Sequence, residues 1–421
     1  MRRHVLAVAS ALVAAGVKPR DPVLLISENR VEWVYCDFAI QTIGAVTVPI
    51  YPNSPDEMAQ TIAADSGATY AIASGALLAA KLKVAGPLRH IATMDGEVAD
   101  WVRQPTLNLA ELAARSSRVT PEDICTIVYT SGTTGTPKGV ELAHRNLVDT
   151  ARAAVQVHPI TDQDSSLSWL PLAHVFGRIN EMFDGMVYGG ETWISAGPDH
   201  LVEELQHVKP TVMCSAPRVY EKMYAAVIAR VHKASPVQQA IFRWAVRIGT
   251  RFSQTETPGP VLKAQRRLAD RLVLTGLRKQ LTGGRMRFFI SGGAALAQNI
   301  EEFFWAVGVP ILNGWGLTET SSGACSNTLH QHRFLTVGKP LPGVELKIAD
   351  DGEILVKGIG NMLGYHNNPE ATAEVVKDGW FYTGDMERST QTDSSRSPTG
   401  RSRSSRRLVE STSHRYSSST N

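Results

Sequence analysis

The sequence predicts an α/β fold in which helices cover parallel sheets, followed by a small antiparallel barrel from Leu335 onward. Two observations predict it. Apolar runs of strand length alternate with segments of helix length near the start of the chain, and short strands around Gly and Pro replace them after residue 335. With 421 residues, 43% of them hydrophobic, the chain is long enough for a large core and more than one domain.

The alternation is clearest in the first 73 residues. Strands are expected at 21–27, 45–49 and 69–73, and helices at 29–44 and 58–66. The opening Met1-Arg-Arg and the apolar residues 5–17 superficially suggest a signal peptide, but residues 18–21 offer no cleavage pattern. We therefore expect an ordinary helix at the start of the chain.

The later pattern divides the chain into three parts. Strands at 344–348 and 352–357 predict the small barrel. We expect α/β subdomains over residues 1–334, the barrel over 335–385, and a disordered tail over 386–421.

Composition excludes several classes of protein. The net charge of +3 predicts no nucleic acid or other polyanionic partner. No run approaches the roughly 20 apolar residues of a transmembrane helix. The four cysteines, Cys36, Cys125, Cys214 and Cys325, lack metal-ligand spacing, so we expect them to be reduced in a cytoplasmic protein.

The most informative segment is the loop from Tyr129 to Gly139. It holds three glycines, five Ser or Thr hydroxyls and Lys138 directly after the apolar residues 124–128. Glycines let the backbone approach a ligand, N–H groups and hydroxyls donate to phosphate oxygens, and the lysine supplies charge. The loop differs from the P-loop because Pro137 precedes the lysine and Gly139 follows it. The alternative is a polar surface turn.

This loop and four further segments, in the same order, resemble the adenylate-forming superfamily, which includes acyl-CoA synthetases, luciferases and peptide-synthetase adenylation domains. The further segments are residues 170–178, 290–296, 313–320 and 380–385. The resemblance runs from Val5 to Asp385. It implies the superfamily's large N-terminal domain, with two parallel-rich sheets and a barrel. It also implies ATP-dependent conversion of a carboxylate to an acyl-adenylate, release of pyrophosphate, and transfer of the acyl group to a thiol, with AMP released.

The middle of the chain indicates which members of the superfamily the chain resembles most. Residues 218–285 form a long, basic, largely helical insertion, and residues 215–222 at its head resemble long-chain acyl-CoA synthetases. A long-chain fatty acid is therefore the expected substrate, with coenzyme A as co-substrate. The insertion has two interpretations: amphipathic helices that cover the sheet, or a surface that contacts membranes.

The resemblance also implies roles for individual residues. Phosphate groups are expected to contact Thr130, Ser131, Gly132, Thr133, Thr134, Gly135 and Lys138. The rest of the nucleotide is expected to contact Gly293, Ala294, Trp315, Gly316, Leu317 and Thr318, with Asp385 on the ribose hydroxyls. Mg²⁺ is expected at Glu319 and Thr130, since it prefers oxygen ligands. The acid is expected near His174, Gly292 and Gly316, and the catalytic residues are Lys138, His174 and Glu319.

The roles of two of these positions remain open from the sequence. His174 lies in an apolar segment, so it is either a hydrogen-bonded core residue or a group at the mouth of the acyl tunnel. The pair Gly177-Arg178 departs from the acidic-Arg pair that is common in long-chain relatives. The local contacts to substrate are therefore left open.

The end of the chain departs furthest from the superfamily. Its members continue into a mobile domain with a lysine used in adenylation and a loop that presents coenzyme A. Residues 389–421 instead contain twelve serines. An Arg/Ser tract could bind RNA, but residues 407–417, read from the third base of each codon, can spell a string similar to the superfamily's. We interpret the tail as out-of-frame translation and the start of the chain as truncated.

Three functions remain open from the sequence. The chain is an AMP-forming fatty-acid–CoA ligase, an inactive adenylate-binding remnant, or a ligase that loads fatty acid onto a carrier protein.

Overall fold

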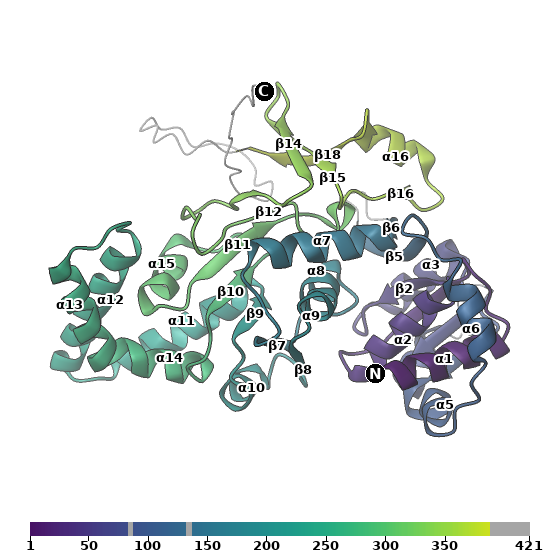
Figure 1. The fold of residues 1–421 in the computed structure, drawn as a ribbon, viewed down its shortest axis with the longest axis horizontal. Helices are drawn as coiled ribbons and strands as arrows, with labels where there is room; N and C mark the ends of the chain where they lie inside the picture. Colours follow the sequence, from purple (N-terminus) through teal and green to yellow (C-terminus); the bar gives the residue numbers. More distant parts are fainter. Residues whose placement is uncertain (83–86, 132–136, 388–421) are drawn as a thin grey trace, which may run out of the picture.

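The computed structural model describes residues 1–82, 87–131 and 137–387, in which two large sheets lie side by side under a smaller one (Figure 1). The first large sheet has the order β16-β6-β5-β2-β1-β3-β4. Its strands are β1 (Pro22–Ile26), β2 (Val46–Ile50), β3 (Tyr70–Ala73), β4 (His90–Thr93), β5 (Ile124–Ser131), β6 (Pro137–Ala143) and β16 (Gly364–Tyr365). The strands from β5 to β4 are parallel, as predicted, whereas β6 and β16 join antiparallel.

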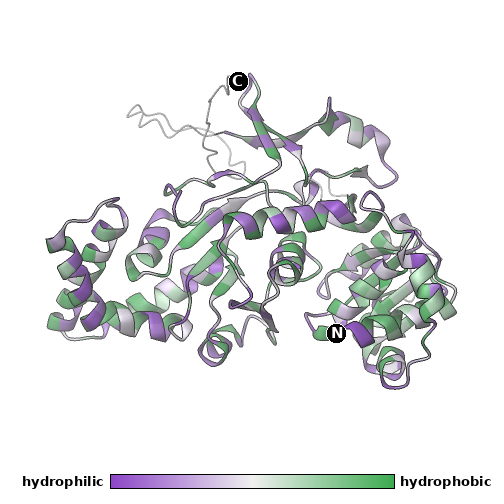
Figure 2. Ribbon diagram, in the orientation of Figure 1, coloured by the Kyte–Doolittle hydropathy of each residue, from purple (hydrophilic) through white to green (hydrophobic). Residues whose placement is uncertain are grey.

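Helices cover both faces of this sheet. They are α1 (Arg2–Ala14), α2 (Val31–Thr42), α3 (Asp56–Ser66), α4 (Ala76–Leu82), the π-helical η1 (Met94–Val98), α5 (Ala99–Arg103) and α6 (Leu109–Ser116). The predicted elements β1, α2, β2, α3 and β3 all form. Their prediction is reliable because the strands are buried on both faces and therefore have continuous apolar sequences, which Figure 2 shows as green strands.

The second large sheet has the order β13-β12-β11-β10-β9-β7-β8. Its strands are β7 (Ser165–Ser168), β8 (Glu191–Ile194), β9 (Val212–Ser215), β10 (Phe288–Ser291), β11 (Ile311–Trp315), β12 (Cys325–Ser326) and β13 (Lys339–Pro340). Around it lie α7 (His144–Val157), α8 (Val175–Gly177), η2 (Arg178–Phe183), α9 (Asp184–Tyr188), α10 (Leu201–Val208), α15 (Gln298–Val307) and η4 (Thr318–Thr320). Helix α7 follows β6 and leads from the first sheet to the second (Figure 1).

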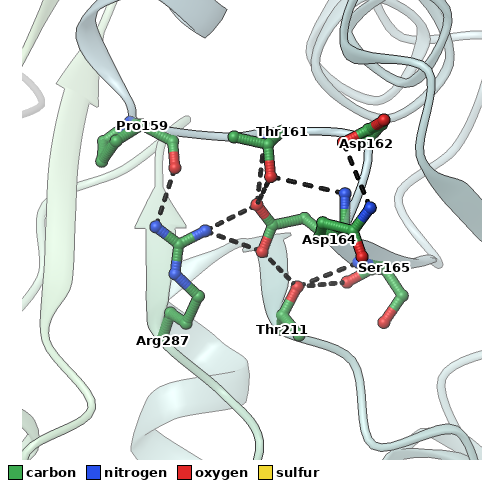
Figure 3. Close-up of polar contacts among 8 residues, drawn as sticks. Pro159, Thr161, Asp162, Asp164, Ser165, Thr211 and Arg287 are labelled. Carbon is green, nitrogen blue, oxygen red and sulfur yellow. Dashed lines mark hydrogen bonds and ion pairs between the residues drawn. The ribbon is translucent and has the colours of Figure 1, made fainter.

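A polar network holds the amino ends of three strands of this sheet (Figure 3). Arg287 donates to both carboxylate oxygens of Asp164, at 2.7 and 2.6 Å, and to the carbonyl of Pro159 at 2.7 Å. The Thr211 hydroxyl donates to the same carboxylate at 2.6 Å. Burial alone would raise the pKa of Asp164, but these hydrogen bonds outweigh it and lower the pKa. The network fixes the sheet at the edge opposite its loops at residues 292 and 316.

The predicted helical insertion consists of α11 (Pro217–His232), α12 (Pro236–Ser253), α13 (Pro260–Ala269), η3 (Asp270–Leu274) and α14 (Thr275–Thr282). Proline at the first helical position starts three of these helices, and Ser235 caps α12. Helix α11 covers the second sheet, where Tyr220 packs on Phe289 and Phe304. Helices α12 and α13 lie farther out, at the left end of the molecule in Figure 1.

The third sheet contains β14 (Val344–Ile348), β15 (Glu353–Gly358), β18 (Trp380–Met386) and β17 (Val376–Lys377), with α16 (Pro369–Val375) beside it. All its pairings are antiparallel, as predicted, but its order β14-β15-β18-β17 has two edges in the described residues. The stretch expected to form a small antiparallel barrel thus contains this four-stranded antiparallel sheet, and β13 and β16 from the same stretch pair with the large sheets.

The tail expected after Asp385 is only partly described. Strand β18 continues to Met386, and residues 388–421 lie outside the described residues. The four cysteines are buried and form no disulfide. Within the described ranges, no helix has the length and apolar character needed to cross a membrane.

Candidate nucleotide and acid site

A cavity of about 210 Å³ lies where the carboxyl ends of β10 and β11 meet η2 and α9. Neighbouring parallel strands end at the same edge of a sheet, which is the usual position for ligand loops in α/β folds. The cavity therefore brings together predicted residues from three separate segments: His174, Gly292, Gly293, Ala294, Trp315, Gly316, Leu317 and Thr318.

The loops at this edge depend on glycine. Gly293 has a φ of +79°, a left-handed conformation that side chains rarely adopt. At Gly316 an added Cβ would lie 2.0 Å from the Ser322 carbonyl oxygen, so a larger residue would displace the backbone. Both glycines let the main chain follow the cavity wall closely.

Trp315 and Asp385 meet although 70 residues separate them. The Trp315 indole N–H donates to the Asp385 carboxylate at 3.0 Å, and Trp315 is largely buried. This contact joins β11 of the second sheet to β18 of the small sheet. It places the predicted ribose acceptor next to the predicted adenine wall.

Glu319 and Lys138 are linked by Tyr365, a residue that the sequence reasoning missed. The Tyr365 hydroxyl donates to Glu319 Oε1 at 2.9 Å, and Lys138 Nζ lies 5.0 Å from the centre of the Tyr365 ring. Burial and the nearby Glu319 carboxylate raise the pKa of Tyr365, so the phenol stays protonated and donates. Tyr365 reaches this position because β16 pairs with β6, a contact between distant segments that leaves no local sequence signal.

The predicted phosphate loop is described only at its ends. Thr130 pairs with Lys138 and Ser131 with Pro137 in the antiparallel β5–β6 ladder. Gly132, Thr133, Thr134 and Gly135 lie outside the described residues. The ladder nevertheless brings Thr130 to the strand that carries Lys138.

Glu319 and Thr130 are suited to a magnesium ion that is bound together with a phosphate ligand. Glu319 offers a carboxylate and Thr130 a hydroxyl, both oxygen ligands of the kind Mg²⁺ prefers. The described residues contain no cluster of three or more His, Cys, Asp or Glu side chains that could hold a metal alone. A Mg²⁺ ion here would therefore need phosphate oxygens and water to complete its shell.

His174 lines the cavity, is exposed, and caps α8. Its Nδ1 accepts from the Phe176 backbone N–H at 3.0 Å. Although the residue is exposed, the surrounding protein desolvates the ring and lowers its pKa. A neutral imidazole that accepts at Nδ1 carries its proton on Nε2 and donates from there.

Arg178 does not line this cavity. Its guanidinium forms a buried ion pair with Asp37 of α2, and it donates to the Thr126 hydroxyl at 2.6 Å. Arg178 is therefore a packing residue, which ties the segment after His174 to the first sheet. The sequence gives no sign of it because 141 residues separate the two partners.

The comparisons with known proteins agree with this arrangement. A family model described as AMP-binding enzyme matches residues 1–366. The chain is 39% identical to the long-chain-fatty-acid–CoA ligase FadD15 of Mycobacterium bovis, over 90% of this chain and 65% of that protein. It is 30% identical to fatty acyl-CoA synthetase A of Dictyostelium discoideum, over 90% and 61% respectively. The chain thus spans less than two thirds of the length of these two relatives.

Solved structures show the same fold. The inhibitor-bound N-terminal domain of FACL13 from Mycobacterium tuberculosis has a TM-score of 0.72 at 21% identity, covering 91% of this chain and 87% of that one. The anthranilate CoA ligase AuaEII in complex with anthranoyl-AMP has a TM-score of 0.71 at 24% identity, covering 91% and 68%. The family match covers the β5–β6 ladder that contains Lys138 and the loops that line the cavity. The chain therefore belongs to the AMP-binding enzyme family.

Proposed function

We propose that this chain carries the adenylate-forming part of an AMP-forming fatty-acid–CoA ligase. The observation that carries the proposal is the single cavity that joins the loops at Gly293 and Trp315 to His174 and to an interior wall beyond. One end has the glycine loops and indole suited to a nucleotide, and the other leads into the protein. The names of the relatives support fatty acid and coenzyme A as substrates.

In this proposal each residue of the site has a separate role. Trp315 lines the adenine, and Asp385 accepts from the ribose hydroxyls while the Trp315 indole holds its orientation. Lys138 and the Thr130 end of the loop contact the phosphates. Glu319 and Thr130 hold Mg²⁺, which supplies positive charge against the phosphates. His174 donates from Nε2 to an oxygen of the acid or of the adenylate that forms from it.

A second, mostly apolar pocket offers space for an alkyl chain. A second cavity of about 230 Å³ has mostly apolar walls, including Val34, Phe38, Leu172, Met182 and Ile194. A small third cavity shares Asn180 and Asp184 with the first and Glu181 with the second. The apolar walls of the second cavity support a long-chain acid as the substrate.

The test is binding of a non-hydrolysable acyl-adenylate, a long-chain acyl-sulfamoyl adenosine, measured by calorimetry. We expect wild-type chain to bind it, and Asp385→Asn to bind about tenfold more weakly because an amide offers one acceptor oxygen instead of two. Asp378→Asn, the same change at an exposed turn beside β18, is the matched control and should bind like wild type. Failure of the wild-type chain to bind would overturn the proposal.

We also infer that the outer face of α13 and η3 contacts anionic membrane surfaces. Residues 217–282 contain thirteen Lys and Arg against three Asp and Glu, in a chain of net charge +3. Val261, Leu268 and Leu272 recur at helical spacing on this face and are 70%, 49% and 57% exposed. Exposed Lys263, Arg267 and Arg271 accompany them. Apolar residues flanked by basic ones suit the interface of an anionic bilayer.

Co-sedimentation with lipid vesicles tests this inference. Binding is expected to vesicles with phosphatidylglycerol, to fall with added salt, and to be weak with phosphatidylcholine alone. The triple change Lys263→Gln, Arg267→Gln and Arg271→Gln should remove most of it. A triple change at exposed Arg2, Arg89 and Arg118 to Gln, which removes equal charge elsewhere, should not. Equal loss in both triple variants would contradict a specific surface.

A further inference from the structure

Tyr365 lies between two side chains of opposite charge. Its hydroxyl donates to Glu319 Oε1 at 2.9 Å, and Lys138 Nζ lies over its ring, 5.0 Å from the centre. All three residues are partly exposed. One aromatic side chain thus contacts both the carboxylate assigned to Mg²⁺ and the lysine assigned to the phosphates.

The backbone around Tyr365 is fixed independently of its hydroxyl. Strand β16, which carries Tyr365, pairs with β6. On one side of it, the His366 N–H donates to the Gly139 carbonyl of β6 at 2.7 Å. On the other side, the Met362 N–H donates to the Glu319 carbonyl of η4 at 2.8 Å. The backbone therefore joins η4 to β6 without help from the phenol hydroxyl.

The hydroxyl acts instead on the Glu319 side chain. A partly exposed glutamate is long and flexible, and holding it in one rotamer costs conformational entropy. Groups that hydrogen-bond a metal-binding carboxylate orient it and raise the affinity for the ion. The phenol donates its proton, because an ionised carboxylate offers only acceptors. The bond therefore orients the Glu319 carboxylate and leaves it charged.

The ring acts on Lys138 in a different way. A cation within about 6 Å of the centre of an aromatic ring, over its face, is attracted to the ring electrostatically. The lysine side chain is flexible, so this attraction favours one position of the ammonium group. An aromatic ring, unlike a carboxylate partner, does not neutralise the lysine. The charge of Lys138 thus remains available to a phosphate.

We propose that Tyr365 is a positioning residue of the nucleotide site: its hydroxyl orients Glu319 for the Mg²⁺ ion that accompanies ATP, and its ring holds Lys138 for the phosphates. The inference rests on the proposed function, in which Glu319 and Lys138 have these roles. It assigns two separable effects to two parts of one side chain.

Binding of ATP without acid, measured by calorimetry with Mg²⁺ and with EDTA, separates the two effects. Tyr365→Phe keeps the ring and removes the hydroxyl. It should bind ATP like wild type in EDTA, but it should need about tenfold more Mg²⁺ to reach half of the gain in affinity. Tyr365→Leu also removes the ring, so it should in addition bind ATP about threefold more weakly in EDTA.

Tyr382→Phe is the matched control. Lys377 Nζ lies 5.1 Å from the centre of the Tyr382 ring, so this variant removes a hydroxyl from a ring with the same kind of lysine contact. It should resemble wild type both with Mg²⁺ and in EDTA.

Two results would overturn the role of the hydroxyl. Tyr365→Phe would have an unchanged need for Mg²⁺, or it would bind ATP equally weakly with and without Mg²⁺, as a merely structural role requires. A Tyr365→Leu variant that matches Tyr365→Phe in EDTA would overturn the role of the ring. The proposed function would stand in each case if Glu319→Gln still lowered the dependence on Mg²⁺. If Mg²⁺ did not affect ATP binding by wild-type chain, this inference and the proposed metal site would both fail.

Discussion

Replacing Arg178 by methionine is expected to lower the free energy of unfolding by about 3–5 kcal/mol, because it leaves the Asp37 carboxylate buried without its partner. Both side chains are almost fully buried, at 1% and 0% exposure. The guanidinium also donates to Thr126 of β5 and lies 5.6 Å from the Trp33 ring. The substitution thus disconnects η2 from α2 and β5 at once.

Urea denaturation followed by circular dichroism measures the effect. The double variant Arg178→Met with Asp37→Leu should recover much of the loss, because it removes the unpaired charge together with its partner. Arg152→Met is the matched control, since Arg152 pairs with Asp149 at the surface, at 3.5 Å, and such pairs contribute less than about 1 kcal/mol. A loss for Arg178→Met no larger than for Arg152→Met would show that the buried pair has no such role.

Glu319→Gln is expected to reduce the rate of acyl-adenylate formation by about 100-fold, because the amide no longer offers a charged oxygen to Mg²⁺. The hydrogen bond from Tyr365 to Glu319 remains possible in this variant, so the local fold should persist. Glu374→Gln, at an exposed position of α16, is the control. Release of pyrophosphate from ATP in the presence of fatty acid measures the rate.

A second readout does not depend on turnover. ATP should bind wild-type chain more tightly with Mg²⁺ than without it, and this difference should shrink in Glu319→Gln but persist in Glu374→Gln. Equal dependence on Mg²⁺ in all three proteins would remove Glu319 from the proposed metal site.

Much of the site could be anticipated because its residues stand in segments with local sequence signals. The loop at residue 316 requires glycine because a Cβ there would meet the Ser322 carbonyl. This is a constraint between residues only six apart in the sequence. The buried strands β1 and β2 likewise have apolar sequences that identify them without reference to the rest of the fold. The roles of the predicted residues remain predictions, and those at 132–135 lie outside the described residues.

Contacts between distant segments could not be anticipated. Tyr365 reaches Glu319 through a two-residue strand, and β13 and β16 pair with the large sheets. Strands this short carry no periodicity, and the register that pairs them is decided by packing across the whole molecule.

The sequence by itself determined the α/β class, the order of the first strands and helices, and the segments that form the edge of the cavity. Each of these depends on local patterns of burial and on backbone conformation. Only the tertiary structure decided that Arg178 is a buried partner of Asp37 and that Tyr365 lies between Glu319 and Lys138. Burial and hydrogen bonding between segments far apart in sequence set those roles, because a side chain's charge and free atoms depend on neighbours that only folding supplies.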